Sequence, residues 1–103
     1  MAGPIRLTAP TSDVLSVLLE AAAENTPTYG LAICQTTGHG SGTVYPILRR
    51  LETIGWVRSY WDDSEATGPR KRLLEMTAQG RGEAASALAQ RQAKSSGRRG
   101  WSA

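Results

Sequence analysis

The segment from Gly42 to Ile54 constrains the fold most, because its residues separate onto two faces of a helix. The apolar residues recur at helical spacing, at Val44, Ile47, Leu48, Leu51 and Ile54. The opposite arc carries Gly42, Tyr45, Pro46, Arg49 and Thr53, with Arg50 at its edge. Pro46 fits such a helix only if it starts late, near Gly42 or Thr43, so that the missing N–H falls in the first turn. We therefore predict a helix over residues 41–54 that rests on a core, with Gly55 ending it.

Two helices are predicted before this segment. Residues 1–10 are predicted to form an arm, because Gly3, Pro4 and Pro10 break any helix, and residues 5–8 suit a short strand. Thr11 or Ser12 caps the first helix, which ends near Asn25 because Pro27 disfavours helix in the residue before it. Its apolar residues are Val14, Leu15, Val17, Leu18, Leu19 and Ala22. So many apolar residues fit either a dimer contact or a helix central to a small core.

The second helix is expected from Thr28 to Thr37, before a turn at residues 38–40. Leu31, Ile33 and Cys34 supply its apolar side, with Cys34 packed as a small hydrophobe and His39 exposed in the turn.

Two strands and a last helix are predicted after Gly55. Residues 56–61 and 70–76 are rich in strand-forming side chains, and the acidic segment 62–69 between them is a hairpin loop. Thr77 caps a helix that extends to about Lys94, and residues 95–103 have the composition of a flexible basic tail.

Composition narrows the class of protein. A chain of 103 residues forms one domain. It has no apolar run of membrane-spanning length and no apolar secretory leader before Pro10, so we expect a cytoplasmic protein. A single cysteine and a single histidine predict no disulfide and no structural zinc site. The glycine-rich turn at 38–42 lacks the residues of a nucleotide loop, and no serine has a paired base, so we expect neither enzyme nor cofactor.

The charges are unevenly distributed. Residues 1–69 hold four arginines and seven acidic residues, a net charge of −3, whereas residues 70–103 hold eight basic and two acidic residues, a net charge of +6. A basic region beside a mildly acidic body is typical of a phosphate-binding surface, although a solvated basic tail has the same composition.

The predicted order of elements is that of a winged helix-turn-helix, an α+β fold that is mostly helical. It has a three-helix core, a two-stranded β-wing and a C-terminal helix, all within residues 11–94. In this fold the helix at 41–54 enters the DNA major groove and the hairpin at 56–76 serves as the wing.

Three motifs carry a resemblance to a known family. They are Tyr29-Gly30-Leu31, the run from Ser41 to Glu52 with Gly55-Trp56-Val57, and the run from Gly68 to Arg72 with residues 76–81. Over residues 11–85 the chain resembles the PadR family of bacterial transcriptional regulators. The resemblance implies a homodimeric repressor that binds an inverted-repeat operator, often its own.

The chain departs from that family at two places. Leu73-Leu74-Glu75-Met76 stands where the family usually has Tyr-Tyr-Arg-Leu, so that an acid replaces an arginine. Only one weakly apolar helix follows the wing, whereas larger members carry a longer helical C-terminal domain for dimerisation and ligand contacts. Dimer geometry and effector binding are therefore left open.

The predicted DNA-binding residues lie on the second and third helices and on the wing. They are Tyr29, Ser41, Gly42, Thr43, Tyr45, Pro46, Arg49, Arg50, Arg70, Lys71 and Arg72. Arg49 is the best candidate for a base contact, since arginine binds guanine O6 and N7 with two hydrogen bonds. Arg50 contacts a phosphate or pairs with a neighbour. Alternation along the second strand places Lys71 on the opposite face from Arg70 and Arg72.

Other residues of this set have alternative interpretations. Ser41 and Thr43 donate to phosphates from the helix N-terminus, or act as plain caps. Tyr45 contacts a phosphate or a thymine methyl group, or packs against Trp56. Tyr29 reaches a phosphate, or is only partly buried.

The sequence is also compatible with two alternative functions. One is a winged helix that binds a protein partner. The other is a regulator that responds to planar aromatic molecules at the dimer interface, through Trp56, Tyr60 and Trp61. No membrane partner is expected.

Overall fold

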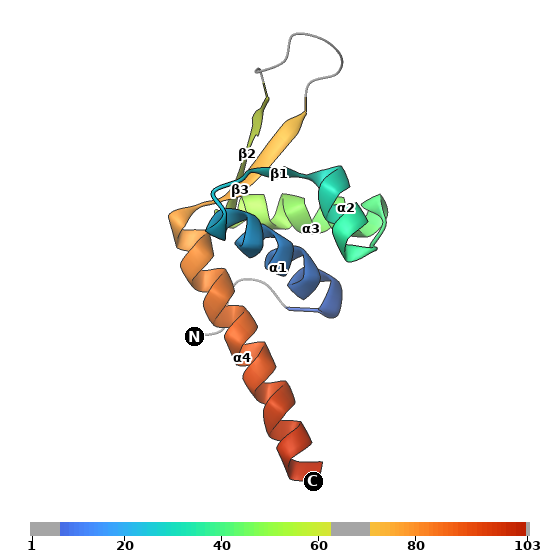
Figure 1. Cartoon of the computed structure of the whole chain (residues 1–103), viewed down its shortest axis with the longest axis vertical. Helices are drawn as coiled ribbons and strands as arrows, with labels where there is room; N and C mark the ends of the chain where they lie inside the picture. Colours follow the sequence, from blue (N-terminus) through green and yellow to red (C-terminus); the bar gives the residue numbers. More distant parts are fainter. Residues whose placement is uncertain (1–6, 63–70, 103) are drawn as a thin grey trace.

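A computed structural model of the chain describes residues 7–62 and 71–102, with side chains up to residue 93 (Figure 1). In these residues the chain forms helices α1 (Ala9–Ala23), α2 (Gly30–Thr37), α3 (Ser41–Thr53) and α4 (Ala78–Ser102). The strands are β1 (Thr28–Tyr29), β2 (Val57–Trp61) and β3 (Arg72–Met76). They pair antiparallel in the order β1-β3-β2. The prediction of a mostly helical α+β winged-helix fold is confirmed.

The first helix begins earlier than predicted. The Thr8 side chain caps α1 and accepts a hydrogen bond from the Thr11 N–H over 3.3 Å. Pro10 lies in the first turn, where its missing N–H removes no helical bond, so the prediction that Pro10 breaks the helix was wrong. The first two residues of α1, Ala9 and Pro10, thus belong to the segment that was predicted as an arm. Leu7 and Thr8 are not in a strand, and residues 1–6 lie outside the described residues.

The second helix is shorter than predicted because its first two residues form a strand. Thr28 pairs with Leu74 and Tyr29 pairs with Leu73, which adds β1 to the free edge of β3. Threonine and tyrosine both favour extended backbone, and Tyr29 is extended at φ −148°. The helical interpretation of these two residues was therefore wrong.

In the third helix, Pro46 lies in the interior and not in the first turn. α3 begins at Ser41, after Gly40 as N-cap, so Pro46 is the sixth helical residue. The expectation that Pro46 lies in the first turn was wrong, and the carbonyl of Gly42 has no N–H four residues on to bind. The helix ends as predicted: Gly55 follows the C-cap at φ +85°, and the Trp56 N–H donates to the Leu51 carbonyl over 3.0 Å.

The core lies around α1, which packs against α2, α3, α4 and β3. Its buried residues are Val14, Leu15, Leu18, Ile33, Val44, Leu48, Leu51, Trp56, Val57, Leu74, Met76 and Ala84. This arrangement supports α1 as the central helix of a small core. Cys34 packs against that core as expected, whereas Leu31, predicted on the apolar side of α2, is 56% exposed.

The last helix starts as predicted and continues further. The Thr77 hydroxyl oxygen accepts a hydrogen bond from the Gly80 N–H over 2.9 Å, which confirms Thr77 as the cap of α4. The helix runs to Ser102, although residues 95–103 were predicted as a flexible tail. No proline interrupts this stretch, and glycine disfavours a helix by only about 1 kcal/mol per residue. In Figure 1, α4 and the hairpin project from opposite ends of the helical body.

Candidate nucleic-acid interface

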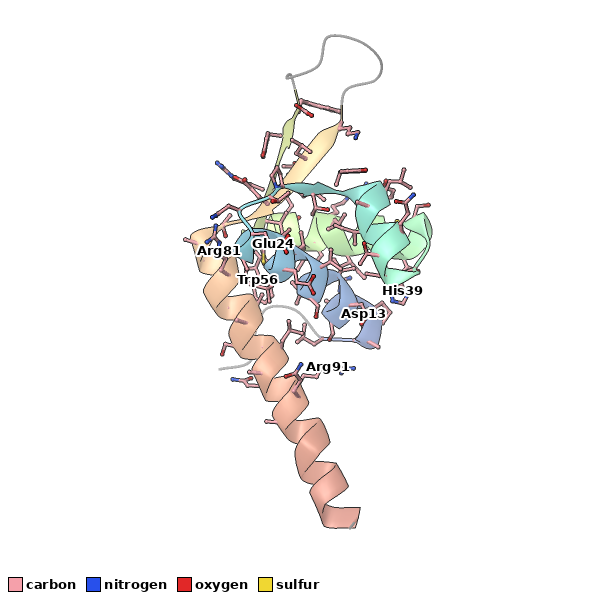
Figure 2. All side chains as sticks on the ribbon, viewed as in Figure 1. Asp13, Glu24, His39, Trp56, Arg81 and Arg91 are labelled. Atoms are coloured by element: carbon pink, nitrogen blue, oxygen red, sulfur yellow. The ribbon has the colours of Figure 1, made fainter. Side chains whose placement is uncertain are left out.

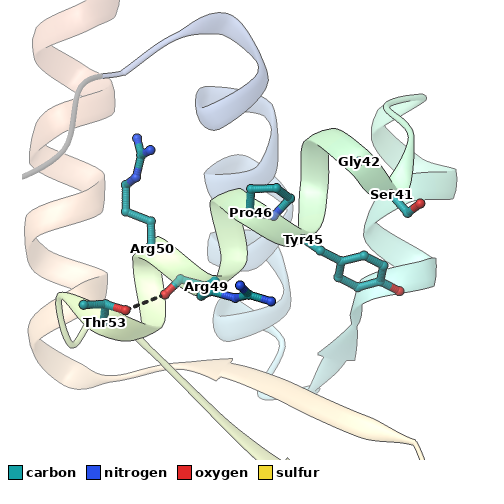
Figure 3. A pocket seen from close by; sticks show the side chains of 7 residues that line it. All are labelled: Ser41, Gly42, Tyr45, Pro46, Arg49, Arg50 and Thr53. Carbon is teal, nitrogen blue, oxygen red and sulfur yellow. Dashed lines mark hydrogen bonds between the residues drawn. The ribbon is translucent and has the colours of Figure 1, made fainter.

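One face of α3 is exposed and lines a shallow groove. Seven residues line this groove: Ser41, Gly42, Tyr45, Pro46, Arg49, Arg50 and Thr53 (Figure 3). All of them are exposed, as is Thr43, while Val44, Leu48 and Leu51 on the other face are buried. Apart from Ser41 and Thr43, which the sequence pattern had not assigned to a face, these residues lie on the faces predicted for them. α3 therefore presents a polar surface on a rigid, core-anchored element.

The two arginines of α3 are exposed to solvent. Within residues 7–62 and 71–93, neither Arg49 nor Arg50 makes a side-chain hydrogen bond or ion pair. Arg49 extends toward the side of Tyr45, whereas Arg50 points away from both (Figure 3). The Thr53 hydroxyl donates to the Arg49 carbonyl over 2.9 Å. The guanidinium donors of both arginines are thus available to a ligand outside the chain.

Tyr45 packs on the second helix instead of on Trp56. A Cβ atom built on Gly30 would lie 2.2 Å from Cε1 of the Tyr45 ring, so the ring covers the start of α2. Tyr45 remains 47% exposed. Trp56 is buried beyond the other end of α3, so the alternative that these two rings pack together was wrong.

The wing cations are held by neighbouring side chains. The Lys71 ammonium lies 4.6 Å from the centre of the Tyr29 ring, and Tyr29 is half-buried. Arg72 binds Ser59 and Glu52, away from Tyr29. These partners agree with the prediction that Lys71 and Arg72 point to opposite faces, while Arg70 lies outside the described residues.

Glu75, the acid that replaces the usual arginine of the family pattern, has a partner on the neighbouring strand. Glu75 faces Arg58 across the hairpin and forms an ion pair with it. Arg58 is therefore engaged within the wing, and no acidic charge is left unpaired at this position.

A second hollow joins α3 to the sheet, with a volume of about 570 Å³. Its lining combines apolar residues with cations of α3 and β3, and comprises Tyr29, Gly30, Leu31, Tyr45, Leu48, Arg49, Glu52, Lys71, Arg72 and Leu74. Predicted DNA-binding residues from three separate motifs thus line one hollow.

The family of the chain follows from its match to a family model. Residues 18–86 match the model of the transcriptional regulator PadR-like family. The chain belongs to the PadR family. It is thus a DNA-binding transcriptional regulator, and its family is one of regulators, not of enzymes. No protein with a curated description matches it.

Solved structures share the fold of this PadR-family chain. A PadR family regulator from Clostridium difficile is 18% identical, covers 93% of this chain and 100% of its own, and superposes with a TM-score of 0.74. A PadR-like transcription factor from Bacteroides fragilis is 20% identical, with 84% and 82% covered and a TM-score of 0.67. A putative DNA-binding protein from Ralstonia eutropha is 25% identical, with 80% and 98% covered and a TM-score of 0.63.

The turn of the PadR helix-turn-helix is tied to the first helix. His39 Nε2 lies 2.9 Å from Asp13 Oδ2, a contact between residues 26 apart in the sequence (Figure 2). The His39 side chain is 29% exposed, so this residue of the turn is half-buried and not exposed as predicted. A polar histidine in a glycine-rich turn gives no signal of a partner so far away.

Metal and aromatic-ligand sites find little support in the described part of this PadR chain. There, no three histidine, cysteine, aspartate or glutamate side chains gather as metal ligands. Trp56 is buried in the core, while Tyr60 and Trp61 project from successive positions of β2 and so to opposite faces. Within the described residues of one copy, these three rings therefore do not share one face. Among the same residues, no helix is long and apolar enough to cross a membrane.

Proposed function

We propose that this PadR-family regulator is a sequence-specific repressor that binds an inverted-repeat operator as a homodimer. α3 enters the major groove, and the β2–β3 hairpin is the wing. The observation that carries the proposal is the exposed face of α3, on which Arg49 and Arg50 have no partner among the described residues. An exposed arginine pair on a rigid helix suits the major groove, which is wide enough to admit a helix.

Arg49 is assigned the base contact and Arg50 a phosphate contact. Arg49 and Tyr45 extend to the same side of α3, beside the hollow that leads to the wing (Figure 3). Gly42 and Pro46 offer no long side chain, so the helix can approach the bases closely between Ser41 and Arg49. Ser41 and Thr43, near the positive end of the helix, are assigned to phosphates.

The wing contributes mainly through its cations beside α3. Lys71 lies over Tyr29 next to the α3 surface, and a solvated lysine there attracts phosphate. Arg70 is retained as a phosphate ligand from the sequence pattern alone. Arg72 is already bound to Ser59 and Glu52 within the molecule.

Binding to the DNA just upstream of the protein's own coding region tests the proposal. Fluorescence anisotropy is measured with scrambled competitor DNA at two salt concentrations. We expect tight, competitor-resistant binding that weakens steeply with salt, because each phosphate contact releases counterions. Weak, salt-insensitive binding to both DNAs would instead favour a winged helix that binds a protein partner.

Replacing Arg49 tests the assigned base contact. We expect Arg49→Ala to weaken operator binding by about 1–3 kcal/mol and to relax specificity at one position. Arg81→Ala is the matched control, since it removes the same charge from an exposed position on α4, away from the α3 face. Equal loss on operator and random DNA would reduce Arg49 to a phosphate contact, and unchanged binding would remove it from the site.

A further inference from the structure

Three polar residues, one each from α3, β2 and β3, are in contact beside the C-terminal end of α3. Glu52 is near the end of α3, Ser59 is at the middle of β2 and Arg72 opens β3. The Ser59 hydroxyl donates to Glu52 Oε2 over 2.7 Å and accepts from Arg72 Nε and Nη2 over 2.9 and 2.7 Å. Arg72 Nη2 also lies 3.4 Å from Glu52 Oε2. We call these three residues the wing clasp.

The hydroxyl at the centre of the wing clasp is fully used. A serine hydroxyl has one donor and two acceptor lone pairs, and all three are occupied here. The Arg72 guanidinium is further held 5.9 Å from the centre of the Trp61 ring. Both strands of the hairpin are thus attached to one carboxylate of the DNA-facing helix.

Neither stability nor charge explains an acid at this position. The side chains of Glu52 and Arg72 are 40% and 56% exposed, and ion pairs so exposed add little to stability. Glu52 is the one acidic residue of α3. A carboxylate beside a DNA-binding face repels phosphates and lowers affinity. The Glu52 carboxylate is therefore better explained by the position in which it holds its two partners.

We infer that Glu52 is a positioning residue for DNA recognition. Through Ser59 and Arg72 it sets the position of the hairpin relative to α3, so that helix and wing meet the DNA in one fixed relation. The inference rests on the DNA binding proposed above. Arg72, assigned to DNA by the sequence pattern, then acts mainly by holding the wing.

The test compares Glu52→Ala with Glu83→Ala in the anisotropy experiment, on operator and on random DNA. Glu83 is an exposed acid of α4 that lines neither hollow at α3, so its removal makes the same charge change elsewhere on the surface. We expect Glu52→Ala to lower operator affinity roughly tenfold while affinity for random DNA is unchanged or slightly higher. Glu83→Ala should leave operator affinity unchanged. Tighter operator binding by Glu52→Ala would mean plain electrostatic repulsion and would overturn the inference.

A double-mutant cycle separates positioning from direct contact. If Glu52 and Arg72 act through one clasp, the Glu52→Ala, Arg72→Ala double variant binds operator no more weakly than the worse single variant. Additive losses would overturn the inference. Glu52→Gln, whose amide oxygen still accepts from Ser59, should bind more tightly than Glu52→Ala. We expect all variants to have similar melting temperatures, which shows that the substitutions do not impair folding. NMR relaxation should show faster amide motion of the hairpin in Glu52→Ala, as expected if Glu52 positions the wing.

Failure of the inference is distinguishable from failure of the proposed function. A wild-type chain that binds operator and random DNA equally would overturn the proposed function, and the inference with it. If the wild-type chain prefers operator to random DNA and the Glu52→Ala variant shows the same preference, only the inference is overturned.

Discussion

At the scale of single residues, side chains of the same type have different roles because of their neighbours. Arg49 and Arg72 are both exposed arginines near the same hollow. Arg72 is held by Ser59 and Glu52, whereas Arg49 has no polar side-chain partner among the described residues. Of the two, Arg49 can offer all its donors to DNA without breaking a contact among the described residues.

Glycines of α4 show the same dependence on neighbours. A Cβ atom on Gly80 would lie 2.1 Å from the Trp56 carbonyl oxygen, whereas one on Gly82 would meet nothing within 4 Å. We expect Gly80→Ala to lower the free energy of unfolding by about 1–3 kcal/mol, because backbone atoms must move apart. Gly82→Ala should raise it by up to about 1 kcal/mol through helix propensity.

Urea unfolding of the two glycine variants measures this difference. Both substitutions add one methyl group to the first turns of the same helix, so propensity cancels between them. Similar midpoints for Gly80→Ala and Gly82→Ala would contradict the close approach of α4 to Trp56.

At the scale of elements, α3 carries a local defect on its exposed side. Pro46 cannot donate to the Gly42 carbonyl, four residues earlier. We expect Pro46→Ala to raise the free energy of unfolding by about 1–3 kcal/mol, because it restores that hydrogen bond. Urea unfolding is the measurement.

Pro10→Ala is the control for this prediction. Pro10 lies in the first turn of α1, where a proline removes no helical bond. Both substitutions also free the unfolded chain to the same extent, so that contribution cancels. Equal shifts for the two variants would show that Pro46 does not weaken α3. A stabilised Pro46→Ala variant with weaker operator binding would place the proline ring at the DNA.

At the scale of the whole molecule, the proposed dimer follows from the DNA target. One recognition helix reads few base pairs, and an inverted-repeat operator mirrors a two-fold protein. α4 extends well beyond the body of the domain (Figure 1). We expect a solution mass of twice 11.0 kDa by light scattering at micromolar concentration. A monomeric mass both with and without DNA would contradict the homodimer.

The sequence alone determined the features that depend on neighbouring residues. The helical period of residues 44–54 identified the buried and exposed faces of α3, and Thr77 and Gly55 marked element ends through local hydrogen bonds and a positive φ angle. The hairpin followed from its strand-forming side chains. These signals are local because helix and turn geometry is set within a few residues.

Only the tertiary structure decided which polar groups meet. The pairing of β1 with β3, the contact of His39 with Asp13 and the wing clasp join residues far apart in the sequence. Periodicity places a side chain on a face, but it does not say which other element will approach that face. The contacts of Glu52 with Ser59 and Arg72 therefore escaped prediction, because these residues are brought near one another only when the hairpin folds back onto α3.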